Sequence, residues 1–175
     1  MTPTKFLPLV ATLAALFLHS GCTSAAAPAA AAPATQRSVV SAHGRLQVAH
    51  GRLVGEDGKP VSLAGVSYGW SQWQAKRFFN AGVVNWVKQD WHADIIRAPL
   101  GIHEEDGYFQ NPTENLNRVL AAIDAAIAAD VYVIVDWHDH NAHLHPARAI
   151  GFFQEIARRY GQQPNVIYEI YNEPK

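Results

Sequence analysis

The 175-residue sequence contains a single cysteine, Cys22, so it cannot form a disulfide bond within the chain. It also lacks a block of basic residues: the formal net charge is -1, with 14 Lys and Arg against 15 Asp and Glu. Because nucleic-acid-binding surfaces concentrate positive charge, this balance does not indicate a DNA- or RNA-binding protein. The apolar run at 6–18 is too short to cross a bilayer comfortably and does not predict a membrane-spanning helix.

The first 22 residues have the pattern of an export signal. Lys5 precedes the apolar run at 6–18, and small residues follow it directly before Cys22. Small residues before a cysteine resemble a bacterial lipoprotein signal, in which the cysteine is lipidated, although His19 replaces the usual aliphatic residue. Ordinary signal-peptidase cleavage near 25–27 is the alternative. Both routes predict an exported protein that is secreted, periplasmic or anchored at the cell envelope by the lipid. This lipid is the only membrane attachment that the sequence predicts.

Residues 23–42 are rich in Ala, Pro, Ser and Thr and offer little apolar surface to bury. They are predicted to form a flexible tether. Pro28 and Pro33 argue against a helix in the alanine-rich part, because proline disrupts a helix interior. The folded domain is therefore expected over 43–175.

The folded part alternates extended and helical patterns. Short extended runs at 46–48 and 52–54 predict a hairpin that caps the bottom of a barrel. Further strands are predicted at 61–67, 94–100, 131–135 and 165–172, and helices at 75–89, 111–127 and 146–160. Asn111 is predicted to cap the second of these helices, with Pro112 at its first position.

Strands that alternate with helices at intervals of roughly 35 residues indicate parallel βαβ units. Four such strands make half of a (β/α)8 TIM barrel, which typically needs about 250 residues. The predicted fold class is therefore α/β, with 43–175 as the N-terminal half of such a barrel.

Polar and aromatic side chains follow each predicted strand, at the end of a barrel where catalytic residues lie. They are Trp70 and Trp73, Arg97, Asp136-Trp137-His138, and Asn172-Glu173. Pro174 cannot continue a hydrogen-bonded ladder, so the last strand is expected to deliver an amide and a carboxylate side by side at its end. The arginine is interpreted as a buried guanidinium that keeps a carboxylate ionised. The two loop tryptophans predict either core packing or a platform for stacking sugar rings.

Four motifs in this order resemble the glycoside hydrolase family 5 cellulases, which are retaining endo-β-1,4-glucanases with a (β/α)8 barrel. They are the leading hairpin, Ile-Ile-Arg-Ala at 95–98, Val-Ile-Val-Asp-Trp-His at 133–138, and Asn-Val-Ile-Tyr-Glu-Ile-Tyr-Asn-Glu-Pro at 165–174. The resemblance covers 44–175. It implies hydrolysis of internal β-1,4-glucosidic bonds in cellulose or a related β-glucan, without a cofactor or a metal ion.

The resemblance also implies a role for each residue at the strand ends. Glu173 is the general acid/base, and Asn172 binds the 2-hydroxyl group of the sugar at the cleaved bond. Arg97 supports the charge of the nucleophile, and His138 lines the same subsite. Trp73 stacks on a glucosyl unit, as does Trp70, which lies in a loop that varies within the family.

Retaining hydrolysis requires a second carboxylate about 5 Å from the acid, as the nucleophile. In the family that glutamate follows the seventh strand, so the nucleophile is not in this chain. Glu169 is not expected to replace it, because it lies within the last predicted strand, away from the mouth. Gly101 stands where related enzymes often carry a tyrosine, and the corresponding substrate contact is not expected here.

Two other functions are consistent with parts of the sequence. A dense His/Asp cluster resembles the metal site of a metal-dependent barrel hydrolase; it comprises Asp136, His138, Asp139, His140, His143 and His145. That function leaves Asn172, Glu173 and the tryptophans without a role. Alternatively, the chain is an inactive glucan-binding remnant. Such a half-barrel is expected to have unpaired strand edges and uncovered apolar helix faces.

Overall fold

The computed structural model describes residues 38–174, so the predicted export signal, Cys22 and the tether up to residue 37 lie outside the described range. The elements in chain order are α1 (Val39–His43), β1 (Gln47–Ala49), β2 (Arg52–Val54), β3 (Gly65–Ser67), the 3-10 helix η1 (Trp73–Phe78), α2 (Ala81–Asp90), β4 (Ile95–Gly101), α3 (Pro112–Ala128), β5 (Tyr132–His138), the 3-10 helix η2 (Ala142–Leu144), α4 (Pro146–Tyr160) and β6 (Val166–Glu169). Within this range no helix has the length and apolar character needed to cross a membrane.

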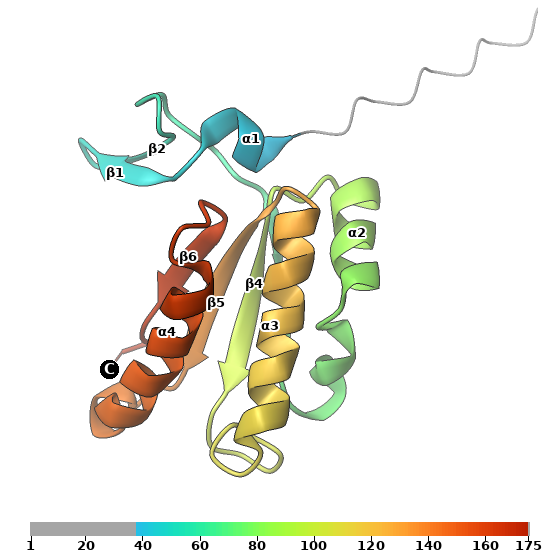
Figure 1. Cartoon of the computed structure of the whole chain (residues 1–175), viewed down its shortest axis with the longest axis vertical. Helices are drawn as coiled ribbons and strands as arrows, with labels where there is room; N and C mark the ends of the chain where they lie inside the picture. The colour runs from blue at the N-terminus through green and yellow to red at the C-terminus, as the bar shows by residue number, and fades with distance from the viewer. Residues whose placement is uncertain (1–37, 175) are drawn as a thin grey trace, which may run out of the picture. The chain divides into compact units, whose positions relative to one another are not determined.

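Four parallel strands form one sheet in the order β3-β4-β5-β6. Helix α3 packs on β4 and β5, with α2 on one side of it and α4 on the other (Figure 1). A doubly wound fold reverses its strand order at a switch point, whereas a (β/α)8 barrel adds each unit beside the previous one. The spatial order equals the chain order here. The prediction of consecutive parallel βαβ units is therefore confirmed.

The core lies between the sheet and these helices. Strand β5 carries a β-branched and aromatic run, and five of its seven residues are buried, as expected for a parallel strand. Its fully buried Trp137 packs against Phe152 of α4, with ring centroids 5.7 Å apart. Ile123 of α3 and Ile96 of β4 are also buried, each with at most 1% of its surface exposed. Each such side chain stabilises the fold by roughly 1.5–3 kcal/mol.

Helix α1 and the β1–β2 hairpin lie at the end of the sheet where the strands begin (Figure 1). The hydroxyl of Tyr132, the first residue of β5, donates to the Gly44 carbonyl at 2.6 Å. The Ser41 hydroxyl donates to Asp130 at 2.8 Å, and Val39 and Val40 are buried. The predicted hairpin cap is confirmed. The prediction of a flexible tether is wrong for 39–42. The stretch 23–42 offers little apolar surface on average, but two of its residues, Val39 and Val40, pack into the core.

Two predicted elements are shorter or divided. The helix predicted at 75–89 is interrupted at Phe79, and α2 begins afresh after Asn80, whose side chain accepts from the Val83 N–H at 3.1 Å. Strand β3 begins at residue 65 rather than 61. Its expected first residues are held elsewhere: the Val61 N–H bonds back to β2, and the Ala64 N–H donates to the Asp94 carboxylate.

Three helix and strand ends also differ from prediction. The side chain of Asn111 does not cap α3; its amide donates instead to Asp106 at 2.9 Å. Strand β5 continues through His138, three residues beyond the predicted end. Strand β6 ends at Glu169, so Asn172 follows the strand instead of ending it.

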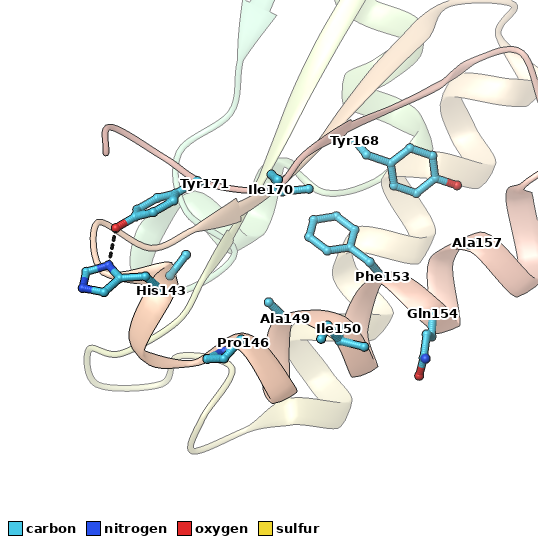
Figure 2. Close-up of a pocket in the computed structure, with 11 residues that line it drawn as sticks. His143, Pro146, Ala149, Ile150, Phe153, Gln154, Ala157, Tyr168, Ile170 and Tyr171 are labelled. Carbon is cyan, nitrogen blue, oxygen red and sulfur yellow. Dashed lines mark hydrogen bonds between the residues drawn. The ribbon is translucent and has the colours of Figure 1, made fainter. Parts of the chain in front are cut away.

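The outer edge of β6 borders an apolar groove of about 640 Å³ against α4. Figure 2 shows Ile150 and Phe153 of α4 on one side of the groove, with Tyr168 and Ile170 on the other. Ile150 is 56% exposed and Ile170 is 70% exposed. The predicted uncovered apolar face is therefore present, at the edge where a further barrel unit would be added.

Candidate functional site

Arg97 lies at the centre of the polar residues that follow the parallel strands. Its Nε and Nη2 atoms donate to the two carboxylate oxygens of Glu169 at 2.7 and 2.8 Å, a bidentate pair. Nη2 also donates to Asn172 Oδ1 at 2.9 Å and lies 2.8 Å from Asp136 Oδ2. The Glu169 bond and the surrounding negative charges raise the pKa of Arg97 above its ordinary value. One permanent cation on β4 therefore ties together groups from β5, β6 and the segment after β6.

Asp136 is a fully buried carboxylate between Arg97 and His138. Burial raises its pKa, and the His138 hydrogen bond and the charge of Arg97 offset only part of this effect. The Asp136 Oδ2 atom lies 2.6 Å from His138 Nδ1, a contact that fixes the orientation of the imidazole ring. The ring lies 4.9 Å from that of Trp70. The network thus connects the partly buried Arg97 to the partly exposed Trp70.

The amide of Asn172 is buried and only half satisfied. Its oxygen accepts from Arg97, whereas its nitrogen finds no hydrogen-bond partner among residues 38–174. A buried donor without a partner costs roughly 1–3 kcal/mol. Because Arg97 fixes which end of the amide is the oxygen, the end without a partner is the N–H donor.

Glu173 extends away from the Arg97 network. Its carboxylate is 77% exposed, and Oε2 lies 3.3 Å from His140 Nδ1, an ion-pair distance when the imidazole is protonated. Its backbone has φ of 48°, a left-handed conformation that is uncommon outside glycine and is often found at functional sites. The carboxylate therefore faces solvent next to the fixed Asn172 amide.

The two predicted tryptophans stack on each other. The Trp70 and Trp73 rings are 5.0 Å apart with planes 28° from parallel. Trp73 is 46% exposed, so core packing is excluded for it. Its φ of 52° is a true outlier for a bulky residue. The rings therefore form a continuous row from the exposed Trp73 through Trp70 to His138, which contacts the Arg97 network.

Glu169 lies closer to the mouth than the sequence predicted. It is the last residue of β6, and its carboxylate shares the Arg97 guanidinium with Asn172. The expectation that Glu169 lies away from the mouth is therefore wrong, because the strand ends three residues early. Its carboxylate is nevertheless engaged by Arg97 in a bidentate ion pair.

Gly101 leaves no room for a tyrosine at its position. A Cβ atom there would lie 2.3 Å from Oε1 of Gln72, which is fully buried. Both amide atoms of Gln72 lack a hydrogen-bond partner within the described range, and nothing in the structure explains this. This packing is consistent with the expectation that residue 101 makes no substrate contact of the kind a tyrosine would make.

The His/Asp cluster predicted as a metal site does not exist as one group. Asp136 and His138 belong to the Arg97 network, His140 faces Glu173, and the His143 Nδ1 atom lies 2.6 Å from the Tyr171 hydroxyl. The prediction of a metal-dependent hydrolase built on that cluster is therefore not supported.

Asp139 and His145 instead join His103, a residue that the sequence did not single out. His103 Nε2 lies 3.1 Å from Asp139 Oδ1, and His145 Nδ1 lies 3.0 Å from Asp139 Oδ2. The Asp139 side chain is fully buried. Burial alone would raise its pKa, but the hydrogen bonds from the Asn141 N–H and the two histidines outweigh it and hold the pKa below its ordinary value.

Comparison with known proteins identifies relatives of the chain. A family model described as Cellulase (glycosyl hydrolase family 5) matches residues 54–175. Endoglucanase Z of Dickeya dadantii is 49% identical over 118 residues, which cover 66% of this chain and 28% of that protein. Endoglucanase N of Pectobacterium atrosepticum is 42% identical over 138 residues, covering 77% of this chain and 30% of that protein.

Solved structures of endoglucanases are also similar to this chain. The catalytic domain of Thermobifida fusca endoglucanase Cel5A superposes with a TM-score of 0.72 at 41% identity. The match covers 77% of this chain and 45% of that domain. A variant of the same domain has been solved in complex with cellotetraose. The chain thus spans less than a third of the curated relatives quoted and under half of this solved domain.

Proposed function

Because the chain belongs to glycosyl hydrolase family 5, we propose that it is part of an endoglucanase that hydrolyses internal β-1,4-glucosidic bonds. The half-satisfied amide of Asn172 beside the exposed Glu173 carboxylate supports this proposal most directly. A free, oriented N–H next to an acid suits a site that binds a sugar hydroxyl group and protonates the neighbouring glycosidic oxygen. The curated relatives quoted are named endoglucanases.

In the proposed reaction Glu173 acts first as an acid and then as a base. Its proton passes to the leaving glycosidic oxygen as the nucleophile attacks the anomeric carbon and forms a glycosyl-enzyme. Glu173 then takes a proton from the water that hydrolyses this intermediate. Asn172 donates to the 2-hydroxyl group of the same sugar. His138 lines the subsite, and Trp70 and Trp73 stack on glucosyl units through their exposed faces.

We propose that the nucleophile comes from a part of the barrel beyond this chain. Asp136 and Glu169, the carboxylates that share Arg97 with the Asn172 amide, are both held by this arginine. The apolar groove along β6 and α4 provides a surface on which a further β/α unit would pack (Figure 2). Arg97 would then support the charge of the incoming nucleophile. The 175-residue chain alone is expected to show no retaining glucanase turnover.

The preferred glucan is proposed from the relatives. Their endoglucanase names, and the cellotetraose bound to a variant of one solved relative, favour cellulose over mannan or a mixed-linkage glucan. We also propose that residues 1–22 direct export, with Cys22 as a candidate lipid anchor. Mass determination of the processed protein would reveal either a lipidated Cys22 at the N-terminus or cleavage further along.

The proposed reaction can be tested on carboxymethylcellulose, with the complete gene product and with the 175-residue chain alone. We expect only the complete product to hydrolyse the polymer, and proton NMR to show the β-anomer first, as retention requires. Chelation with EDTA should leave this activity largely unchanged. First appearance of the α-anomer, or complete loss of activity on chelation, would contradict the proposal. Robust cleavage by the 175-residue chain alone would show that a second copy of this chain, or a separate fragment of the barrel, supplies the nucleophile.

A further inference from the structure

Beyond the glycosidase site, two imidazole rings meet a buried carboxylate that the proposed reaction does not use. His103 lies two residues after β4, Asp139 directly follows β5, and His145 directly precedes α4. Their potential ligand atoms all lie within 4.8 Å of one another. Two separate segments of the chain, the loop after β4 and the connection between β5 and α4, therefore converge on one point.

We propose that His103, Asp139 and His145 bind Zn²⁺. Two imidazole nitrogens and a carboxylate oxygen are common zinc ligands, and three protein ligands leave a fourth position for water. Calcium is not expected here because it prefers six to eight oxygen ligands. The same ligand set also accepts other borderline divalent ions such as Co²⁺ and Ni²⁺.

The ligand distances suit this ion after a small movement. Tetrahedral zinc, with bonds of about 2.0–2.1 Å, places its ligand atoms roughly 3.3 Å apart. The Asp139 oxygens already lie 3.1 Å from His103 and 3.0 Å from His145. These two contacts use different carboxylate oxygens, so one imidazole must shift toward the oxygen that binds the ion, and the two imidazole nitrogens must approach each other. The His103 side chain is 43% exposed and lies in a loop, so its ring has room to turn.

The surroundings of the cluster support a fixed site. The Phe109 ring contacts both imidazole rings edge-on, at 5.1 Å from His103 and 5.0 Å from His145, and so shields one side from solvent. Asp139 is locked in place by the Asn141 N–H at 2.8 Å. Such outer contacts orient metal ligands and strengthen binding.

The bound ion would tie the loop after β4 to the segment between β5 and α4. Asp139 directly follows His138, which we place in the glucan subsite, so the ion would hold one wall of the cleft without touching the reacting bond. This role is independent of the hydrolysis mechanism. It differs from the metal-dependent hydrolase, in which the ion activates the attacking water.

Calorimetric titration of the EDTA-treated complete gene product with ZnCl₂ tests the proposal, with thermal unfolding as a second readout. We expect one zinc ion per chain and, at a 100-fold excess over Kd, a rise in Tm of about 5 °C. Co²⁺ should give the absorption spectrum of a tetrahedral complex. No zinc binding at 100-fold molar excess would overturn the proposal and leave a hydrogen-bonded His-Asp-His group.

The decisive variant is His103→Gln, because its amide still donates to Asp139 but binds zinc poorly. We expect its zinc affinity to fall by roughly tenfold or more, with Tm in EDTA close to that of the wild type. His143→Gln and His92→Asn remove histidines outside the cluster and should leave binding unchanged. Unaltered binding in His103→Gln, or loss of binding in His143→Gln, would place the ion elsewhere and contradict the assignment.

Discussion

Asp136 and Asp139 lie three residues apart, and both side chains are fully buried, yet they are stabilised in opposite ways. Asp136 faces Arg97, a permanent cation, and retains one oxygen without a partner among residues 38–174. Burial dominates there and raises its pKa. Asp139 has partners for both oxygens, and these hydrogen bonds hold its pKa below its ordinary value.

The comparison shows that burial alone does not decide how a carboxylate behaves. Arg97 and His138 both contact one oxygen of Asp136, and Arg97 is its only permanent cation in the described range, so loss of the arginine leaves the carboxylate with the His138 contact alone. Asp139 distributes its contacts over an N–H group and two imidazole rings, so the loss of any one is partly covered by the others.

The largest expected effect on stability comes from Arg97→Met. It leaves Asp136 and Glu169 without their cation, and breaking a buried ion pair in this way costs roughly 3–5 kcal/mol. Urea unfolding of the complete gene product at pH 7 measures the loss. Arg159→Met, which removes an exposed arginine paired with Glu155, serves as the control and should change little. An equal loss of stability in Arg97→Met and Arg159→Met would show that Asp136 does not depend on the Arg97 charge.

A smaller loss is expected for His145→Ala in the presence of EDTA. Asp139 keeps the His103 ring and the Asn141 N–H, so removal of one hydrogen bond should cost about 1–3 kcal/mol. The same urea titration measures it. A loss as large as that of Arg97→Met would mean that Asp139 depends on one partner just as Asp136 does.

The smallest effect is a pH dependence carried by Asp136. Because its pKa is raised in the folded state, the folded protein binds this proton more tightly than the unfolded chain does. Its contribution to stability is therefore full below the ordinary aspartate pKa, near 4, and declines as the pH rises through the raised value. The destabilisation caused by Asp136→Asn should be greater at pH 4 than at pH 7. The opposite trend would show that Arg97 outweighs burial.

The sequence predicted the Arg97 network far better than the Asp139 cluster. His138 follows a predicted strand, Asn172 ends one and Arg97 lies within another, and parallel strands bring such residues to one edge of the sheet. Strand order and local motifs were therefore sufficient to group these residues. His103 lies in a loop 36 residues from Asp139, and no local pattern marks the pair.

The errors in the predicted elements arise where tertiary packing sets the boundary. Composition assigned 39–42 to the tether, although Val39 and Val40 pack into the core. The aromatic and β-branched residues up to Tyr171 suggested a longer strand than β6, which is an edge strand that leaves Ile170 exposed. In both places tertiary packing, which short-range patterns do not encode, set the boundary.

The central claim is that Glu173 supplies the proton to the leaving group. It is tested most directly by Glu173→Gln in the complete gene product, measured as kcat/KM on two substrates. Carboxymethylcellulose needs a protonated leaving oxygen, so kcat/KM should fall by roughly 10²–10⁴. 2,4-Dinitrophenyl cellobioside has a leaving group that departs without a proton, so its kcat/KM should fall far less. Glu56→Gln, at the other end of the sheet, should leave both values unchanged. Equal losses on the two substrates for Glu173→Gln would contradict the claim.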